Sequence, residues 1–158
     1  MSAARDESDR TYPDGRPLAE QVAEFFLDEL LRNGVTTALA FATSHPQSVD
    51  ALFTEARRRQ LRLMTGKVLQ DRHSPDGVRD ETEQSLIDTE DLITRWHGVD
   101  RLGYAITPRF APTSSPAQLR GAGQLAARYP DVWIQSHVAE NLDEVRWACE
   151  LYPRSRSY

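Results

Sequence analysis

The sequence predicts an α/β protein built around a parallel β-sheet. Short runs of apolar and β-branched residues alternate with segments of helical periodicity, and no two strand patterns follow each other directly. After one initial helix, the alternation gives four strands, each followed by a helix. A closed (β/α)8 barrel needs eight such units and typically ~250 residues. The pattern therefore fits either a small open sheet or about half of a barrel.

Composition and charge restrict the class of protein. The chain has 158 residues, of which 39% are apolar, and a net charge of −5 with both signs interspersed. This mixture argues against a nucleic-acid or membrane surface, and no apolar run approaches the ~20 residues of a membrane span. The polar N-terminus lacks the apolar segment of a secretory signal, and the single cysteine, Cys149, has no partner for an internal disulfide. We therefore expect a cytoplasmic protein with one domain.

The chain begins with a polar segment, residues 1–17, which has almost no apolar side chains to bury, so we expect a flexible lead-in. The domain then occupies residues 18–158. Apolar residues at helical spacing from Leu18 to Leu30 indicate the first helix, and Asn33-Gly34 supplies a left-handed stop. Residues 35–43 (VTTALAFAT) are typical of a strand covered on both faces.

The second unit repeats this order. A helix begins with Pro46 in its first turn and ends near residue 60. A strand is expected over residues 61–69 (LRLMTGKVL), and a loop rich in turn-forming residues follows over residues 71–77.

The third unit begins with a helix over residues 81–97, which Gly98 is placed to end. The apolar side chains expected on its buried side are Leu86, Ile87, Leu92, Ile93 and Trp96. The strand that follows covers residues 102–110 (LGYAITPRF).

The fourth unit closes the pattern. Ser115 can cap a helix that begins at Pro116 and ends before residue 130. A strand follows over residues 132–137 (VWIQSH), and the capping-box spacing of Asn141 marks the start of a short last helix.

Catalytic groups in parallel α/β folds gather beyond the carboxyl ends of the strands. The fourth strand is the most informative, because period-two alternation places Trp133, Gln135 and His137 on one face and the apolar set toward the helices. An inward imidazole at a strand end is placed to bind a metal ion, and Glu140 just beyond it could exchange protons with metal-bound water. The alternative is a hydrogen-bonded core histidine followed by a solvated glutamate near a helix N-terminus.

Other strand ends carry further candidate groups. Arg109 and Phe110 end the third strand, and a guanidinium beside an aromatic ring suits a flat heteroaromatic ring or a carboxylate. Arg109 could equally close a salt bridge across the strand ends. Lys67 is expected to form an ion pair rather than a modified metal bridge, and His45 to lie in a loop or helix cap.

The sequence lacks the common signatures of metal, nucleotide and nucleophile chemistry. It contains no His-x-His, HExxH, Cys-x-x-Cys, glycine-rich phosphate loop or Gly-x-Ser-x-Gly. A zinc site needs at least three protein ligands, and His137 is the only strong candidate. The residues alone therefore predict an α/β domain with one suggestive strand end.

Four segments, in this order and at these separations, resemble the guanine deaminase family of zinc-dependent amidohydrolases. They are TTALAFATSHPQSVDALF, GKVLQDR, YAITPRFAPTSSP and IQSHVAEN. The resemblance covers nearly the whole chain from about Thr11 to Tyr158, and the ITPRFAPTSSP and SHVAEN blocks are specific to that family. It implies a partial (β/α)8 barrel corresponding to barrel strands 2–5, and hydrolysis of guanine to xanthine and ammonia.

The resemblance also implies roles for individual residues. His137 is similar to a zinc ligand of the family, and Glu140 to the acid/base that moves protons to the purine and its leaving amine. Arg109 and Phe110 resemble the substrate clamp, with the guanidinium on the purine edge and the ring on its face, so all four residues are expected to contact guanine. The implied cofactor is one zinc ion in the complete enzyme, and complete relatives are expected to form homodimers.

The sequence departs from the family at the other metal ligands, because the family's His-x-His, a further histidine and an aspartate have no counterpart here. We therefore expect an internal fragment that retains little zinc affinity and is inactive alone. An open four-strand piece would also expose two strand edges and one sheet face, which predicts association. Two alternatives stay open: a non-catalytic half-barrel that binds a complementary chain or a copy of itself, and an amidohydrolase acting on another heterocycle.

Overall fold

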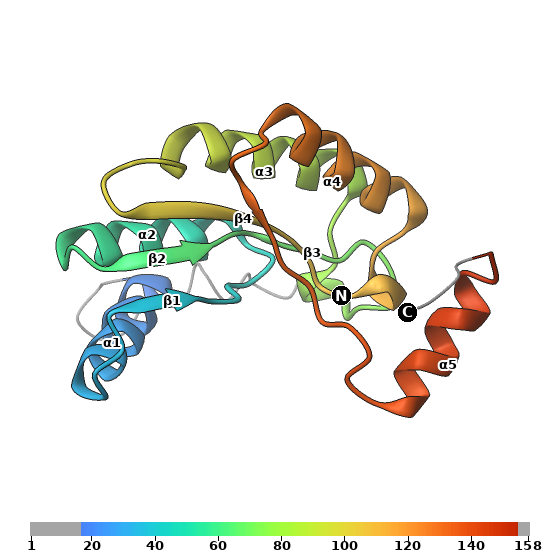
Figure 1. Cartoon of the computed structure of the whole chain (residues 1–158), viewed down its shortest axis with the longest axis horizontal. Helices are drawn as coiled ribbons and strands as arrows, with labels where there is room; N and C mark the ends of the chain where they lie inside the picture. The colour runs from blue at the N-terminus through green and yellow to red at the C-terminus, as the bar shows by residue number, and fades with distance from the viewer. Residues whose placement is uncertain (1–16, 155–158) are drawn as a thin grey trace, which may run out of the picture.

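The computed structural model describes residues 17–154, which form a parallel sheet with helices packed around it (Figure 1). The lead-in expected over residues 1–17 lies, apart from Pro17, outside the described residues. The strands are β1 (Thr37–Leu39), β2 (Arg62–Thr65), β3 (Val68–Leu69), β4 (Leu102–Pro108) and β5 (Trp133–Ile134). The helices are α1 (Leu18–Arg32), α2 (Pro46–Arg58), α3 (Thr82–Trp96), α4 (Pro116–Arg128) and α5 (Leu142–Leu151), with short 3-10 turns η2 (Asp76–Val78) and η3 (Ala111–Thr113).

Every strand pairing is parallel, and the strand order is β1-β2-β4-β3. β1 pairs with β2, and β4 pairs with β2 and β3 and also with β5. Because Leu63 is opposite Leu102 and Val68 is opposite Thr107, β2 and β3 keep one register along β4. They are therefore two parts of the strand expected over residues 61–69. The structure confirms the α/β class and the four strand–helix units of a partial barrel.

A close backbone approach interrupts that strand at Gly66. A Cβ atom at this position would lie 1.9 Å from the Ala105 carbonyl oxygen, so only glycine fits there. The next residue, Lys67, donates its backbone N–H to the Tyr104 hydroxyl instead of to the sheet, at 3.0 Å. The interruption turns the chain just before the residues that reach the carboxyl end of the sheet.

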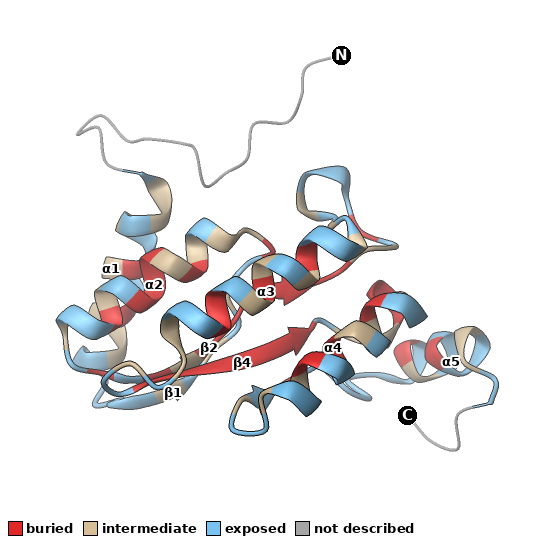
Figure 2. Ribbon diagram, turned by 90° about the horizontal axis from the view of Figure 1, so that it is seen from above, coloured by how far each residue is buried: buried red, intermediate tan, exposed pale blue. Residues whose placement is uncertain are grey.

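Helices α2, α3 and α4 cover one face of the sheet, and β4 is buried along its whole length (Figure 2). Phe53 of α2, Leu92 of α3 and Leu125 of α4 pack with Tyr104 in this layer. The predicted caps are present, since the Ser115 hydroxyl accepts the Gln118 N–H and begins α4. No described helix is both long and apolar enough to cross a lipid bilayer.

Two helical faces differ from the sequence expectation. In α3, Ile87 is 46% exposed, because Thr89, Leu92 and Ile93 define the buried stripe and Ile87 points to the opposite side. In α1, the helix packs on α2 through the stripe that contains Ala23 and Leu27. The apolar residues whose spacing predicted α1 lie largely on its other face, and Phe25 is 67% exposed.

The last strand is shorter than residues 132–137, and one of its faces is open. We expected Ile134 and Val138 to turn toward helices, but Ile134 is 62% exposed and Val138 is also exposed. The reason is the position of α5, which lies apart from the other helices beside η3 and does not cover β5 (Figure 1). The edge strands β1 and β5 and the sheet face with Leu39 and Trp133 are exposed as well, as a partial barrel requires.

Candidate functional site

The carboxyl ends of β3, β4 and β5 bring three of the predicted site residues side by side. The Arg109 N–H donates to the Leu69 carbonyl at 3.0 Å, and the His137 N–H donates to the Arg109 carbonyl at 2.9 Å. These backbone bonds continue the sheet beyond its regular pairing. Arg109 and its neighbour Phe110 therefore sit between the end of β3 and His137.

The Arg109 guanidinium is exposed and held by a neutral partner. Its Nη1 donates to the Gln70 Oε1 at 3.2 Å, and its Cζ lies 5.4 Å from the centre of the Phe110 ring. Within residues 17–154 it forms no salt bridge, so the alternative of an ion pair across the strand ends finds no partner among the described residues. The guanidinium keeps free N–H groups and an aromatic neighbour, an arrangement suited to a flat ring with hydrogen-bond acceptors.

The other contact of Phe110 is an aromatic residue that sequence reasoning missed. Trp147 of α5 meets the Phe110 ring edge-on, with centroids 6.1 Å apart and planes at 73°. The same indole lies 5.2 Å from the His73 ring. Trp147 lies within the periodic apolar pattern that predicts α5. That pattern does not distinguish an aromatic residue of a binding site from one that only packs in the fold.

His137 is exposed at the strand end, so it is not the core histidine of the alternative interpretation. Its Nδ1 lies 3.0 Å from the Arg109 carbonyl oxygen, which can only accept a hydrogen bond, so the neutral imidazole has its proton on Nδ1 and its lone pair on Nε2. The Phe41 ring lies 4.3 Å from the imidazole. This orientation, with one ring nitrogen bound to a backbone carbonyl, is typical of metal-binding histidines.

The alternation predicted for β5 is present. Gln135, two residues before His137, is buried, and its Nε2 donates to the Thr107 hydroxyl and the Ala40 carbonyl, both at 3.0 Å. Trp133 lies over Gly103 on the same face. The face that carries His137 is thus the face away from the covering helices.

Glu140 lies on the turn into α5 and is exposed. The turn passes through Ala139, whose φ of 53° is in the left-handed region that favours glycine. The Glu140 N–H donates to the Glu144 carboxylate at 2.9 Å, but within residues 17–154 its own carboxylate forms no hydrogen bond or ion pair. Within residues 17–154 no hydrogen bond or ion pair joins Glu140 to Arg109 or His137, so the structure brings the predicted residues together only in part.

A buried ion pair lies beneath Arg109. Lys67 is 1% exposed, and its Nζ lies 2.5 Å from the Asp80 Oδ1, which confirms the ion pair expected for Lys67. The Asp80 Oδ2 accepts the Gln70 N–H at 2.8 Å. Burial raises the pKa of the Asp80 carboxyl, and the Lys67 ammonium and Gln70 N–H oppose that rise. Sequence reasoning assigned no role to Asp80 or Gln70. Asp80 lies outside the four family segments, and Gln70 lies within GKVLQDR, but nothing in that segment indicates which neighbour its amide contacts.

A metal ion needs more ligands than these residues supply. Within residues 17–154 no group of three histidine, cysteine, aspartate or glutamate side chains is arranged to hold one. His137 alone is suitably placed and oriented. The described residues therefore do not fit a zinc site by themselves.

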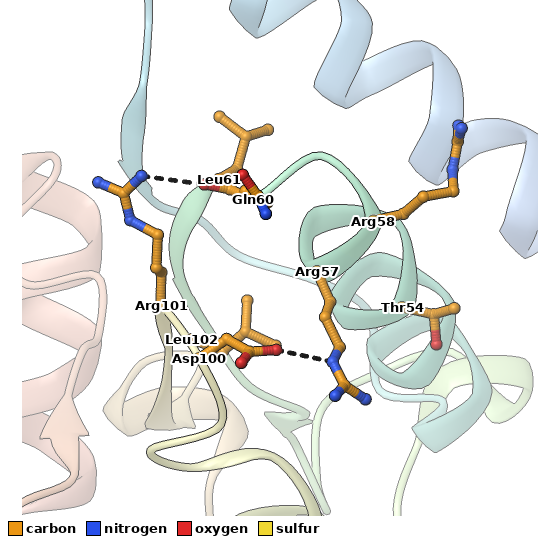
Figure 3. Close-up of a pocket in the computed structure, with 8 residues that line it drawn as sticks. All are labelled: Thr54, Arg57, Arg58, Gln60, Leu61, Asp100, Arg101 and Leu102. Atoms are coloured by element: carbon orange, nitrogen blue, oxygen red, sulfur yellow. Dashed lines mark hydrogen bonds and ion pairs between the residues drawn. The ribbon is translucent and has the colours of Figure 1, made fainter.

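A pocket of about 690 Å³ lies at the opposite, amino end of the sheet, between α2 and the start of β4 (Figure 3). Arg57 donates to Asp100 at 2.7 Å, and Arg101 donates to the Gln60 carbonyl at 3.3 Å (Figure 3). These guanidinium groups are already paired and exposed. The pocket shares no residue with the carboxyl-end site.

Comparisons with known proteins agree on one family. A model of the amidohydrolase family matches residues 16–158. Guanine deaminase of Escherichia coli is 50% identical over 151 residues, which cover 96% of this chain and 34% of that protein. Guanine deaminase of Dictyostelium discoideum is 37% identical, with 89% of this chain and 31% of that protein covered. The chain spans about a third of the length of these relatives.

Solved structures show the same fold. The E. coli guanine deaminase structure superposes with a TM-score of 0.87 at 51% identity, covering 89% of this chain and 33% of that one. Guanine deaminase from C. acetobutylicum with bound guanine in the active site gives a TM-score of 0.85 at 33% identity, covering 89% and 33%. An atrazine chlorohydrolase from Arthrobacter aurescens, 21% identical, shares the fold with a TM-score of 0.72, covering 85% of this chain and 32% of that one. By the extent of its family match and its half-barrel of parallel strands, this chain belongs to the amidohydrolase family.

Proposed function

We propose that this chain forms the purine-binding wall of a hydrolase that converts guanine to xanthine and ammonia. The observation that carries the proposal is the Arg109 guanidinium, which is exposed at the strand ends beside Phe110 and has no acidic partner among residues 17–154. The names of the relatives support guanine as the substrate, and one of the similar structures holds guanine in its active site.

The Hoogsteen edge of guanine matches the groups that Arg109 leaves free. Guanine presents the O6 and N7 acceptors side by side, and an arginine can donate to both. Because Nη1 already donates to Gln70, the remaining N–H groups are available to a purine. Phe110 provides an apolar surface for the ring face.

The reaction adds water to the carbon that bears the exocyclic amine, and ammonia leaves. Glu140 is the residue proposed to carry a proton from the water to the departing nitrogen, because its carboxylate is exposed and makes no other hydrogen bond within the described residues. A carboxylate on a short turn can approach the site when substrate binds. This role is proposed from the sequence motif and the position of Glu140 beyond β5.

The relatives' chemistry implies zinc, and His137 is the residue that would bind it through Nε2. One ligand does not hold a catalytic zinc ion, so the remaining ligands must come from outside residues 17–154 or from another chain. We therefore propose that the 158-residue chain does not deaminate guanine at an enzymatic rate by itself. We also propose that the complete protein forms a homodimer, as expected for complete relatives.

A graft tests the deaminase function directly. Residues 18–158 replace the matching third of E. coli guanine deaminase, and the release of xanthine and ammonia from guanine is measured. We expect turnover within about tenfold of the E. coli enzyme, and an R109A graft whose KM for guanine rises about a hundredfold, since an arginine–guanine pair contributes ~1–3 kcal/mol. A folded graft that binds zinc but hydrolyses another heterocycle in preference to guanine would contradict the proposal.

A further inference from the structure

We propose that Gln70 is a positioning residue for Arg109, and that it holds the guanidinium through a neutral acceptor so that the positive charge stays available to a bound purine. The inference rests on the proposed function, in which Arg109 binds the purine edge. It adds a residue that acts through Arg109 and to which the sequence alone gave no role. The geometry around the Gln70 side chain carries it.

The orientation of the Gln70 amide is fixed from two sides. Its Nε2 donates to the Val78 carbonyl at 2.9 Å, and a carbonyl oxygen can only accept. Its Oε1 therefore faces the Arg109 Nη1 at 3.2 Å, and a guanidinium can only donate. Both partners demand the same orientation, so the amide cannot flip without losing two hydrogen bonds.

The frame around Gln70 is rigid. Gln70 is 6% exposed, and its backbone N–H donates to the Asp80 carboxylate while its carbonyl accepts the Asp80 N–H at 2.9 Å. The Asp80 carboxylate is in turn held by the buried Lys67 ammonium. The ion pair therefore fixes the loop that carries Val78, and Val78 fixes the amide that receives Arg109.

The neutrality of this contact distinguishes Arg109 from the arginines of the chain that are ion-paired. Arg57, Arg95 and Arg128 each form a salt bridge with a carboxylate, at 2.7 to 2.8 Å. Arg109 has an amide oxygen in that place and, among residues 17–154, no carboxylate partner. A glutamate at position 70 would hold the guanidinium too, but it would cancel the charge that strengthens a hydrogen bond to a purine acceptor.

The test uses the 158-residue chain labelled with 15N. The Nε–H resonance of Arg109, assigned with R109K, gives the order parameter of the side chain, and guanine added in steps gives the affinity. Gln70→Met removes the acceptor at nearly the same volume. We expect this variant to lower the order parameter to that of a freely moving arginine and to weaken guanine binding about tenfold, the effect of one hydrogen bond to a charged group.

Two further variants separate positioning from charge and from general damage. Gln70→Glu is expected to keep Arg109 ordered and still weaken guanine binding at least threefold. Gln84→Met, a matched change at an exposed glutamine of α3 that bonds Asp88, is expected to leave both measurements as in the unmodified chain. A Gln70→Met protein with an ordered Arg109 and unchanged affinity would overturn the positioning role, and a Gln70→Glu protein with unchanged affinity would overturn the role of neutrality.

Guanine binding by Arg109 and the positioning of Arg109 by Gln70 are tested by different measurements. If guanine does not shift the Arg109 resonance in the unmodified chain, guanine binding by this wall is contradicted, and with it the proposed function. The order parameter is measured without guanine, so it still decides whether Gln70 positions Arg109.

Discussion

Among the glycines compared in the described part of the chain, Gly66 has the least room for a side chain. A methyl group there would meet the Ala105 carbonyl, whereas one at Gly123 of α4 would meet nothing within 4 Å. We expect G66A to lower the free energy of unfolding by about 1–3 kcal/mol through overpacking. The matched change G123A should raise it by up to about 1 kcal/mol, because alanine favours the helix. Urea titrations of both variants measure the difference, and a G66A protein as stable as the unmodified chain would contradict the close approach.

Tyr104 gives the fold a dependence on alkaline pH. Burial raises the pKa of its phenol well above the ordinary value near 10. The folded state therefore holds this proton more tightly than the unfolded state, and the stability it contributes is complete below pH 10 and is lost as the pH rises further.

The variant Y104F tests this dependence. At pH 7 it should lower the free energy of unfolding by about 1–3 kcal/mol, because the buried N–H of Lys67 loses its acceptor. Above pH 10 the gap between the two proteins should shrink, since phenylalanine cannot ionise and the other tyrosines are common to both. Chemical denaturation at pH 8 and pH 11 measures the gap, and an equal gap at both values would show that Tyr104 does not cause the dependence.

Single residues also mark the limit of what the sequence could predict about the site. The positions of Arg109, Phe110 and His137 at the strand ends were predictable from the strand pattern. The contacts of Gln70 and Asp80 were not, although Gln70 also stands at a strand end, because they depend on a loop that returns to the end of β3 and on the direction of one amide. The local sequence pattern does not show where this loop packs in the folded chain.

At the scale of elements, the Ser115 side chain at the start of α4 both caps the helix and binds a neighbouring segment. The Ser115 hydroxyl accepts the Gln118 N–H and also donates to the Asp71 carboxylate at 2.6 Å. Asp71 follows directly after Gln70. The cap therefore ties α4 to the segment that supports the candidate site.

Removing this cap should cost more than removing an ordinary helical hydroxyl. We expect S115A to lower the free energy of unfolding by about 1–2 kcal/mol, the usual effect of losing an N-cap. T94A is the control, because the Thr94 hydroxyl only bonds carbonyls of its own helix, and alanine there should cost nothing measurable. Equal losses in the two variants would contradict the special role of Ser115.

The elements themselves were largely predictable, and the errors have a common cause. Helix starts at Pro46 and Pro116 follow from local chemistry, so they agree with the structure. Burial of Phe25 and Ile134 depends on which other elements pack nearby, which periodicity does not contain. The shortened β5 is a further example, because its length depends on a partner strand rather than on its own residues.

At the scale of the whole molecule, apolar surface remains open on several elements. Phe25 on α1, and Trp133 and Ile134 on β5, are more than half exposed. Surfaces of this kind drive association. We expect the chain to form larger species as its concentration rises, as sedimentation velocity would show.

The variant I134K places a charge on the open strand and should shift the distribution toward the monomer. The exposed Val22 of α1 allows a matched comparison, because V22K changes a helix face rather than a strand edge. Association through the strand edge predicts a larger shift for I134K. Monomers at every concentration in the unmodified chain would contradict the prediction.

We propose that this chain carries one part of a deaminase site and not a complete one. The most direct test is to purify the 158-residue chain with zinc present, measure bound metal per chain, and assay the same sample for conversion of guanine to xanthine. Because His137 is the one suitably placed ligand among the described residues, we expect far less than one zinc per chain and no xanthine above background. Zinc near one per chain together with steady turnover would contradict the claim and would show that assemblies of this chain complete the site.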